Sequence, residues 1–204
     1  MKIAATRALL LAVVGFLLAL SGCSEKPADD TKAAESVAET PIAATAPALV
    51  QAAGRGDLTE IRALLDAGAE IDVTDALGRT PLHMAAFYGN PKTSALLIAR
   101  GANIEARDRI GMTPLHAAVI SGGRREVESL IERNADVTAK TDAGQTPLHL
   151  SAATGQPKLS KYLIAQGADP QDTDKDGKTP LFYASRNGHP ITTGVLKQFT
   201  SRKN

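Results

Sequence analysis

Three histidines are the residues of this chain with the greatest capacity for chemistry. His83, His116 and His149 each follow a Thr-Pro-Leu triplet and are spaced 33 residues apart. Imidazole can bind a metal or transfer a proton near neutral pH. Three imidazoles placed one per repeat cannot converge on one ion, so we expect no metal site among them. His189 stands alone in a predicted turn.

The acidic run Asp172–Gly177 is the other candidate, because its D-x-D-x-D-G pattern matches the first half of an EF-hand calcium loop. The twelfth position of such a loop should be a bidentate glutamate, but the chain has Tyr183 there. No nucleophile elbow, zinc-protease motif or phosphate-binding glycine loop occurs in the sequence. We therefore predict no cofactor, no metal and no catalytic residue, and we expect that the chain is not an enzyme. A calcium-dependent enzyme is the weakest alternative.

The composition excludes further classes of protein. The chain has 204 residues, with 23 Lys and Arg against 22 Asp and Glu, and this near-neutral charge argues against a nucleic-acid binder. Apolar residues make up 43% and charged residues 22%, which is typical of a soluble globular chain. Aromatic residues are scarce, so we expect a core of small residues and layers of Leu and Ile.

The N-terminal segment, residues 1–22, has the layout of an export signal. Two basic residues, Lys2 and Arg7, precede an apolar run of 13 residues from Ala8 to Leu20. At ~1.5 Å per residue, this run is too short to cross a hydrocarbon core of ~30 Å as a helix. The segment ends in Leu-Ser-Gly before Cys23, which is the only cysteine of the chain.

This ending resembles the lipobox of bacterial lipoproteins. The resemblance implies that the signal is cut before Cys23 and that Cys23 is acylated, with palmitate among the expected acyl chains. In such proteins a serine at the next position, here Ser24, permits transport to the outer membrane. We therefore expect an outer-membrane anchor facing the periplasm; the alternative is an ordinary signal peptide with a chance cysteine. Residues 23–47, rich in Ala, Pro and polar residues, are predicted to form the lipidated cysteine and a flexible tether.

From residue 48 onward the sequence repeats itself. Thr-Pro-Leu recurs every 33 residues without insertion, and glycines recur in phase with it. This pattern resembles the ankyrin repeat, whose signature is a 33-residue period with T-P-L-H-x-A. The resemblance implies an all-α ankyrin-repeat solenoid of about five helix-turn-helix units with β-hairpin connections, in which each imidazole joins adjacent repeats through a backbone hydrogen bond. The units are expected at about residues 48–74, 75–107, 108–140, 141–173 and 174–204, the first and last being capping units.

Ankyrin-like stacks bind partners on a concave surface formed by the hairpin tips and the first helices. Carried over to this chain, the partner-binding positions of the second and third repeats hold apolar, aromatic and arginine side chains. The apolar ones are expected to be exposed, and Phe87 is expected to insert into a partner. The predicted partner-binding residues are Leu77, Arg79, Phe87, Tyr88, Arg109, Ile110, Met112 and Ile120.

These features predict a monomeric, non-catalytic protein-binding module held at the envelope membrane by its lipid. Some bacterial ankyrin-repeat lipoproteins of this layout resemble immunity proteins, which inhibit a secreted toxin such as a lipase. An accessory or protective factor in envelope assembly or oxidative-stress defence is the alternative. The partner protein is not identified by the sequence.

Overall fold

The structure is a computed structural model that describes residues 47–200. The predicted signal segment, Cys23 and most of the predicted tether lie outside these residues. Ten α-helices follow one another between residues 47 and 200, and this part of the chain contains no β-strand. The helices are α2 (Ala48–Arg55), α3 (Leu58–Asp66), α4 (Pro81–Tyr88), α5 (Pro91–Ala99), α6 (Pro114–Ser121), α7 (Arg124–Ile131), α8 (Pro147–Ala153), α9 (Pro157–Ala165), α10 (Pro180–Arg186) and α11 (Pro190–Thr200).

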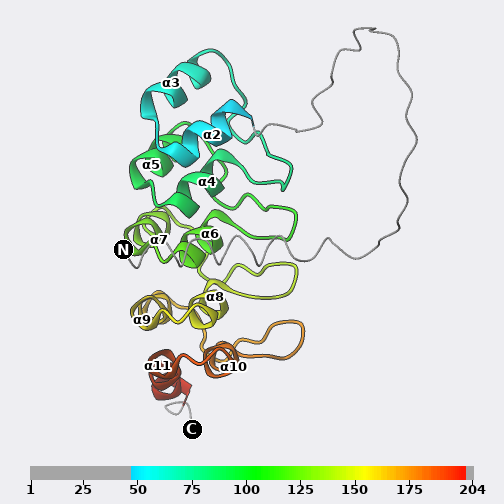
Figure 1. The fold of residues 1–204 in the computed structure, drawn as a ribbon, viewed down its shortest axis with the longest axis vertical. Helices are drawn as coiled ribbons and strands as arrows, with labels where there is room; N and C mark the ends of the chain where they lie inside the picture. The colour runs from blue at the N-terminus through cyan, green and yellow to red at the C-terminus, as the bar shows by residue number, and fades with distance from the viewer. Residues whose placement is uncertain (1–46, 201–204) are drawn as a thin grey trace, which may run out of the picture. The chain divides into compact units, whose positions relative to one another are not determined.

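The helices form five antiparallel pairs stacked in one column (Figure 1). The first helices of the pairs, α2, α4, α6, α8 and α10, pack on one another in that order. The second helices, α3, α5, α7, α9 and α11, lie on one side of this layer, and the long connecting loops project from the other side. The prediction of an all-α repeat solenoid is confirmed.

The start of each inner repeat is determined by its Thr-Pro-Leu-His segment. In α4, Thr80 is the N-cap and Pro81 fills the first helical position, where its missing N–H costs no hydrogen bond. The Thr80 hydroxyl oxygen accepts from the backbone N–H of His83 at 3.4 Å. The helix ends at Gly89, whose φ of 70° is a conformation that glycine adopts without strain. Short helices of this kind therefore have both ends encoded locally.

The core consists of columns of leucines and alanines. The leucines of the second helices, Leu97, Leu130 and Leu163, are fully buried, as predicted. Small residues such as Ala85 and Ala118 on the first helices are also fully buried, and they let neighbouring helices approach closely. Because each layer is built from one repeat, the core grows by stacking rather than by enlarging one centre.

The connecting loops form hydrogen-bonded turns in place of the predicted β-hairpins. In the first of them, Asp75 N donates to Arg79 O at 3.0 Å, and Gly78 N donates to Asp75 O at 2.9 Å. Asn134 has a φ of 67° at a position where neighbouring repeats have glycine, which confirms its predicted left-handed conformation. Among the helices within residues 47–200, none has the length and apolar character needed to span a membrane.

Candidate protein-binding surface

The three histidines form a column of identical hydrogen bonds between repeats. The Nδ1 atom of His83 accepts from Thr80 N at 3.2 Å and from the Thr80 hydroxyl at 2.9 Å. Its Nε2–H therefore donates to Met112 O of the next repeat at 2.9 Å. His116 and His149 make the corresponding bonds to Gln145 O and Lys178 O, at 3.2 and 3.0 Å. The predicted role of these side chains in joining adjacent repeats is confirmed.

The same burial makes these imidazoles unsuited to acid–base chemistry near neutral pH. Burial lowers the pKa of His83 and His149, and it lowers the pKa of His116 to about 4. Each ring is therefore neutral, with both nitrogens already used in hydrogen bonds. Within residues 47–200, no three His, Cys, Asp or Glu side chains are arranged to hold a metal ion.

The calcium-like acidic run has a different role in the structure. The Asp174 carboxylate accepts from the backbone N–H groups of Asp176 and Lys178, at 3.0 and 2.8 Å, and from the Tyr183 hydroxyl at 2.5 Å. Asp75 and Asp108 brace their own loops in the same way, one and two repeats earlier along the 33-residue register from Thr141. The aspartate is thus a loop-bracing residue whose oxygens are occupied within the fold.

The loop tips form a straight column of side chains along the stack. Adjacent tips are linked by backbone bonds: Arg109 N donates to Leu77 O at 3.1 Å, and Asp142 N donates to Ile110 O at 3.0 Å. Leu77 is 47% exposed and Ile110 is 60% exposed. Two large apolar side chains are therefore held in register in solvent, which single surface residues of a monomer do not require.

The arginines beside this column differ in availability. Arg79 is held by Asp75 through two contacts, Nε to Oδ2 at 2.8 Å and Nη2 to Oδ2 at 2.7 Å. Arg107 donates to Lys140 O at 2.8 Å and lies 3.3 Å from the Asp142 carboxylate. Arg109 is exposed and forms no ion pair with any other residue between 47 and 200, so its charge is available to a partner.

A hollow of about 390 Å³ opens between the tips of the third and fourth repeats. Its lining is mostly apolar and includes Ile110, Met112, Ala143 and Leu150, with Arg109 at its edge. The hollow is continuous with the exposed column of loop tips, since Ile110 and Ala143 belong to both. We call Leu77, Ile110, Tyr88 and this hollow the tip surface.

A family model of ankyrin repeats in three copies matches residues 49–141 and 122–201. The chain belongs to the ankyrin-repeat family. No curated protein sequence matches it significantly. Ankyrin repeats are in general protein-interaction modules, and the tip surface occupies the part of the fold that such modules use.

The predicted exposure of the apolar site residues is correct for three side chains of the ankyrin stack and wrong for three. Leu77, Tyr88 and Ile110 are exposed. The other three, Phe87, Met112 and Ile120, are half-buried. The Phe87 side chain packs against the core and meets the Tyr88 ring edge-on at 5.3 Å between centroids. Phe87 therefore has a structural reason to be aromatic, and Tyr88 replaces it as the aromatic side chain that a partner can reach.

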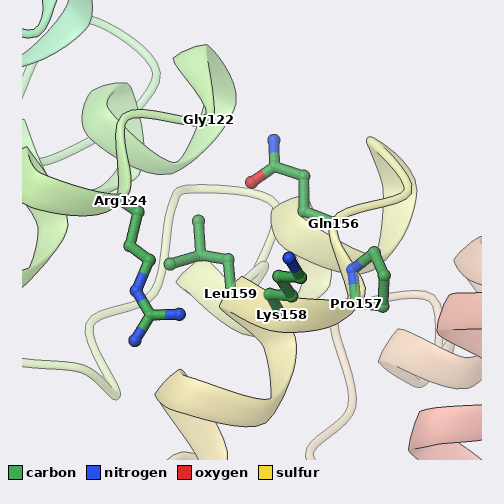
Figure 2. Close-up of a pocket in the computed structure, with 6 residues that line it drawn as sticks. All are labelled: Gly122, Arg124, Gln156, Pro157, Lys158 and Leu159. Atoms are coloured by element: carbon green, nitrogen blue, oxygen red, sulfur yellow. The ribbon is translucent and has the colours of Figure 1, made fainter.

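A second hollow of the ankyrin stack, of about 400 Å³, lies between the mid-repeat turns of the third and fourth repeats (Figure 2). Arg124 borders it, but its guanidinium bonds to Glu128 at 2.6 Å and lies over the Tyr162 ring. The Gln156 amide on the other side donates to Val119 O at 2.9 Å. These polar groups serve the fold, and no predicted partner-binding residue lines this hollow.

Sequence reasoning missed one titratable side chain in the core. Glu126 of α7 is fully buried, and neither of its carboxylate oxygens has a hydrogen-bond partner. Burial raises its pKa to about 7, against smaller opposing influences of the Ser94 hydroxyl and the Arg133 guanidinium. The 33-residue register carried a signal for this burial, because the equivalent positions hold Thr93 and Leu159, which are buried as well.

Proposed function

We propose that this ankyrin-repeat protein is a non-catalytic binding module whose partner protein docks on the tip surface. The observation that carries the proposal is the pair Leu77 and Ile110, which stand 47% and 60% exposed on backbone-linked loops. Holding two such side chains in water is unfavourable by ~25 cal/mol per Å² of apolar area. A partner that covers them recovers this free energy without ordering a flexible loop.

The proposal includes attachment to the outer membrane through Cys23, with the repeats facing the periplasm. Its support is the Leu-Ser-Gly-Cys ending of the N-terminal apolar run, and the serine that follows. An inhibitor held at the membrane is concentrated where a secreted lipase acts. Immunity against such a toxin is therefore the form of the function that we favour.

Capture from detergent-solubilised envelopes tests the docking surface. The wild-type chain is compared with a Leu77→Ser/Ile110→Ser double variant and with a matched control, Ile191→Ser, which removes a 72% exposed isoleucine from α11 outside the tip surface. We expect the double variant to lose at least ~2 kcal/mol of affinity, about thirtyfold, for the protein that the wild type and the control retain. Equal capture by all three proteins would remove the tip surface from the proposal.

The anchor is tested separately by labelling cells with palmitate. Wild-type protein should incorporate the label and fractionate with the outer membrane, whereas Cys23→Ala should do neither. Equal incorporation by both proteins would contradict lipidation at Cys23 and leave the docking surface unaffected.

A further inference from the structure

The residue at the loop tip changes size along the stack. Positions 77, 110, 143 and 176 are equivalent in the 33-residue register, and they hold Leu77, Ile110, Ala143 and Asp176. The hollow of about 390 Å³ lies where the large Ile110 is followed by the small Ala143. Its position thus coincides with the one step in this column where an apolar side chain becomes short.

Backbone contacts show that the loops themselves have not moved apart at this point. Asp142 N donates to Ile110 O at 3.0 Å on one side, and Lys175 N donates to Ala143 O at 3.0 Å on the other. Gly144 has a φ of 81°, and a Cβ there would meet Lys175 N at 2.8 Å. The tips are packed at backbone distance, so the hollow results from the small side chain of Ala143.

The charges around the hollow are cationic on both sides. Arg109 and Lys175 occupy equivalent positions of the third and fifth repeats, and both are exposed. Neither forms an ion pair with another residue in the 47–200 range. The acidic residue between them, Asp142, is already engaged by Arg107 at 3.3 Å. The free charges that a ligand would meet are therefore positive.

We propose that this hollow is a binding site for one large apolar side chain of a partner segment that carries a carboxylate beside it. The apolar side chain fills the space next to Ile110 and Ala143, and the carboxylate pairs with Arg109 or Lys175. A protein segment fits better than an isolated small molecule, because the hollow is open and continuous with the exposed side chains of Ile110 and Leu77. The site rests on the proposed function and specifies the chemistry of its partner.

Random peptides displayed on phage and selected on the immobilised full chain test the site. We expect the enriched peptides to share an aromatic or aliphatic residue next to Asp or Glu. Ala143→Leu fills the hollow with the side chain that Leu77 provides at the equivalent position, so the loop should keep its conformation. We expect this variant to bind the enriched peptides at least tenfold more weakly, and Arg109→Gln/Lys175→Gln to remove the preference for an acidic residue.

The matched control is Ala99→Leu, which makes the same change at an exposed alanine of α5 outside the tip surface. It should bind the peptides as the wild type does. Selection of peptides without the apolar and acidic pair, or unchanged binding by Ala143→Leu, would overturn the inference. If Ala143→Leu binds normally while Ile110→Ser does not, only the hollow is wrong. If Ile110→Ser also binds normally, the tip surface of the proposed function fails with it.

Discussion

Two pairs of polar side chains lie inside the stack, and their hydrogen bonding differs completely. In the fourth repeat, Ser151 and Ser160 are 2.9 Å apart between hydroxyl oxygens, and each also bonds to a backbone carbonyl of its own repeat. Between the second and third repeats, Ser94 and Glu126 are equally buried, but their side-chain oxygens have no hydrogen-bond partner. The first pair is completed within one repeat, whereas the second depends on how two repeats meet.

The difference shows what a repeat fold tolerates in its interior. A hydroxyl placed beside carbonyls of its own helices is satisfied wherever the repeat is stacked. A carboxyl at an interface between second helices must find its partners on a neighbouring repeat, and α5 offers Glu126 only the Ser94 hydroxyl. The unpaired carboxyl then responds by favouring its neutral form, because a buried charge costs more than a buried acid.

The largest expected effect in this region is that of an apolar truncation beside the carboxyl. Leu130→Ala removes a fully buried leucine from the same helix, α7. We expect it to lower the free energy of unfolding by about 2–5 kcal/mol, because it leaves a cavity in the middle of the stack. Urea unfolding followed by circular dichroism measures this. A loss below about 1 kcal/mol would show that the layer relaxes around the missing side chain.

The second prediction concerns pH. The pKa of Glu126 is about 7 in the folded chain and near 4.5 otherwise, so the folded state binds the extra proton between these values. The free energy of unfolding should therefore fall as the pH rises from about 4.5 to 7, by about 3 kcal/mol relative to Glu126→Gln.

Urea unfolding of both proteins at a series of pH values isolates this difference, with Glu132→Gln at an exposed position as the control. Protonation of the histidine column acts in the other direction, because the depressed pKa of His116, about 4, makes stability fall as the pH drops below 6.5. This second effect is common to all the variants and cancels in the comparison. A Glu126→Gln protein with the same pH profile as the wild type would mean that Glu126 is hydrated or paired in solution.

The third prediction replaces the unpaired carboxyl by the residue of the next repeat. The register position of Glu126 holds Leu159 in the fourth repeat, where it is buried. We expect Glu126→Leu to raise the free energy of unfolding at pH 8 by about 2 kcal/mol, since it removes a buried, uncompensated charge. Thermal unfolding at pH 8 and pH 5 should show a larger gain at the higher pH. A gain independent of pH would point to packing alone.

The smallest effects are expected from the serines, and they have opposite characters. Ser160→Ala leaves Ser151 with one bond fewer and should cost about 1 kcal/mol. Ser94→Ala removes a hydroxyl that has no hydrogen-bond partner and should change stability by less than about 0.5 kcal/mol. The comparison of the two regions would be wrong if the two alanine variants lost equal stability in urea.

The fold could be predicted from the sequence because its signals are local and repeated in one register. Thr80 and Gly89 set the ends of a helix through their own backbone contacts, and the same types of residue recur one period later. The role of the histidines also followed, since Nε2 of His83 reaches a carbonyl at a fixed offset of 29 residues. The candidate site was predicted less well, because Phe87, Met112 and Ile120 share the columns of exposed residues but turn toward the core.

By itself the sequence determined the period, the bounds of the helices, the leucine layers and the column of loop tips. These depend on spacing along the chain, which stacking converts directly into positions in space. Only the tertiary structure decided which side chains of one column stay in solvent, where Ala143 leaves a hollow, and that Glu126 is buried without a partner. Those properties depend on side chains that neighbouring repeats bring together, and a residue's own register position does not specify them.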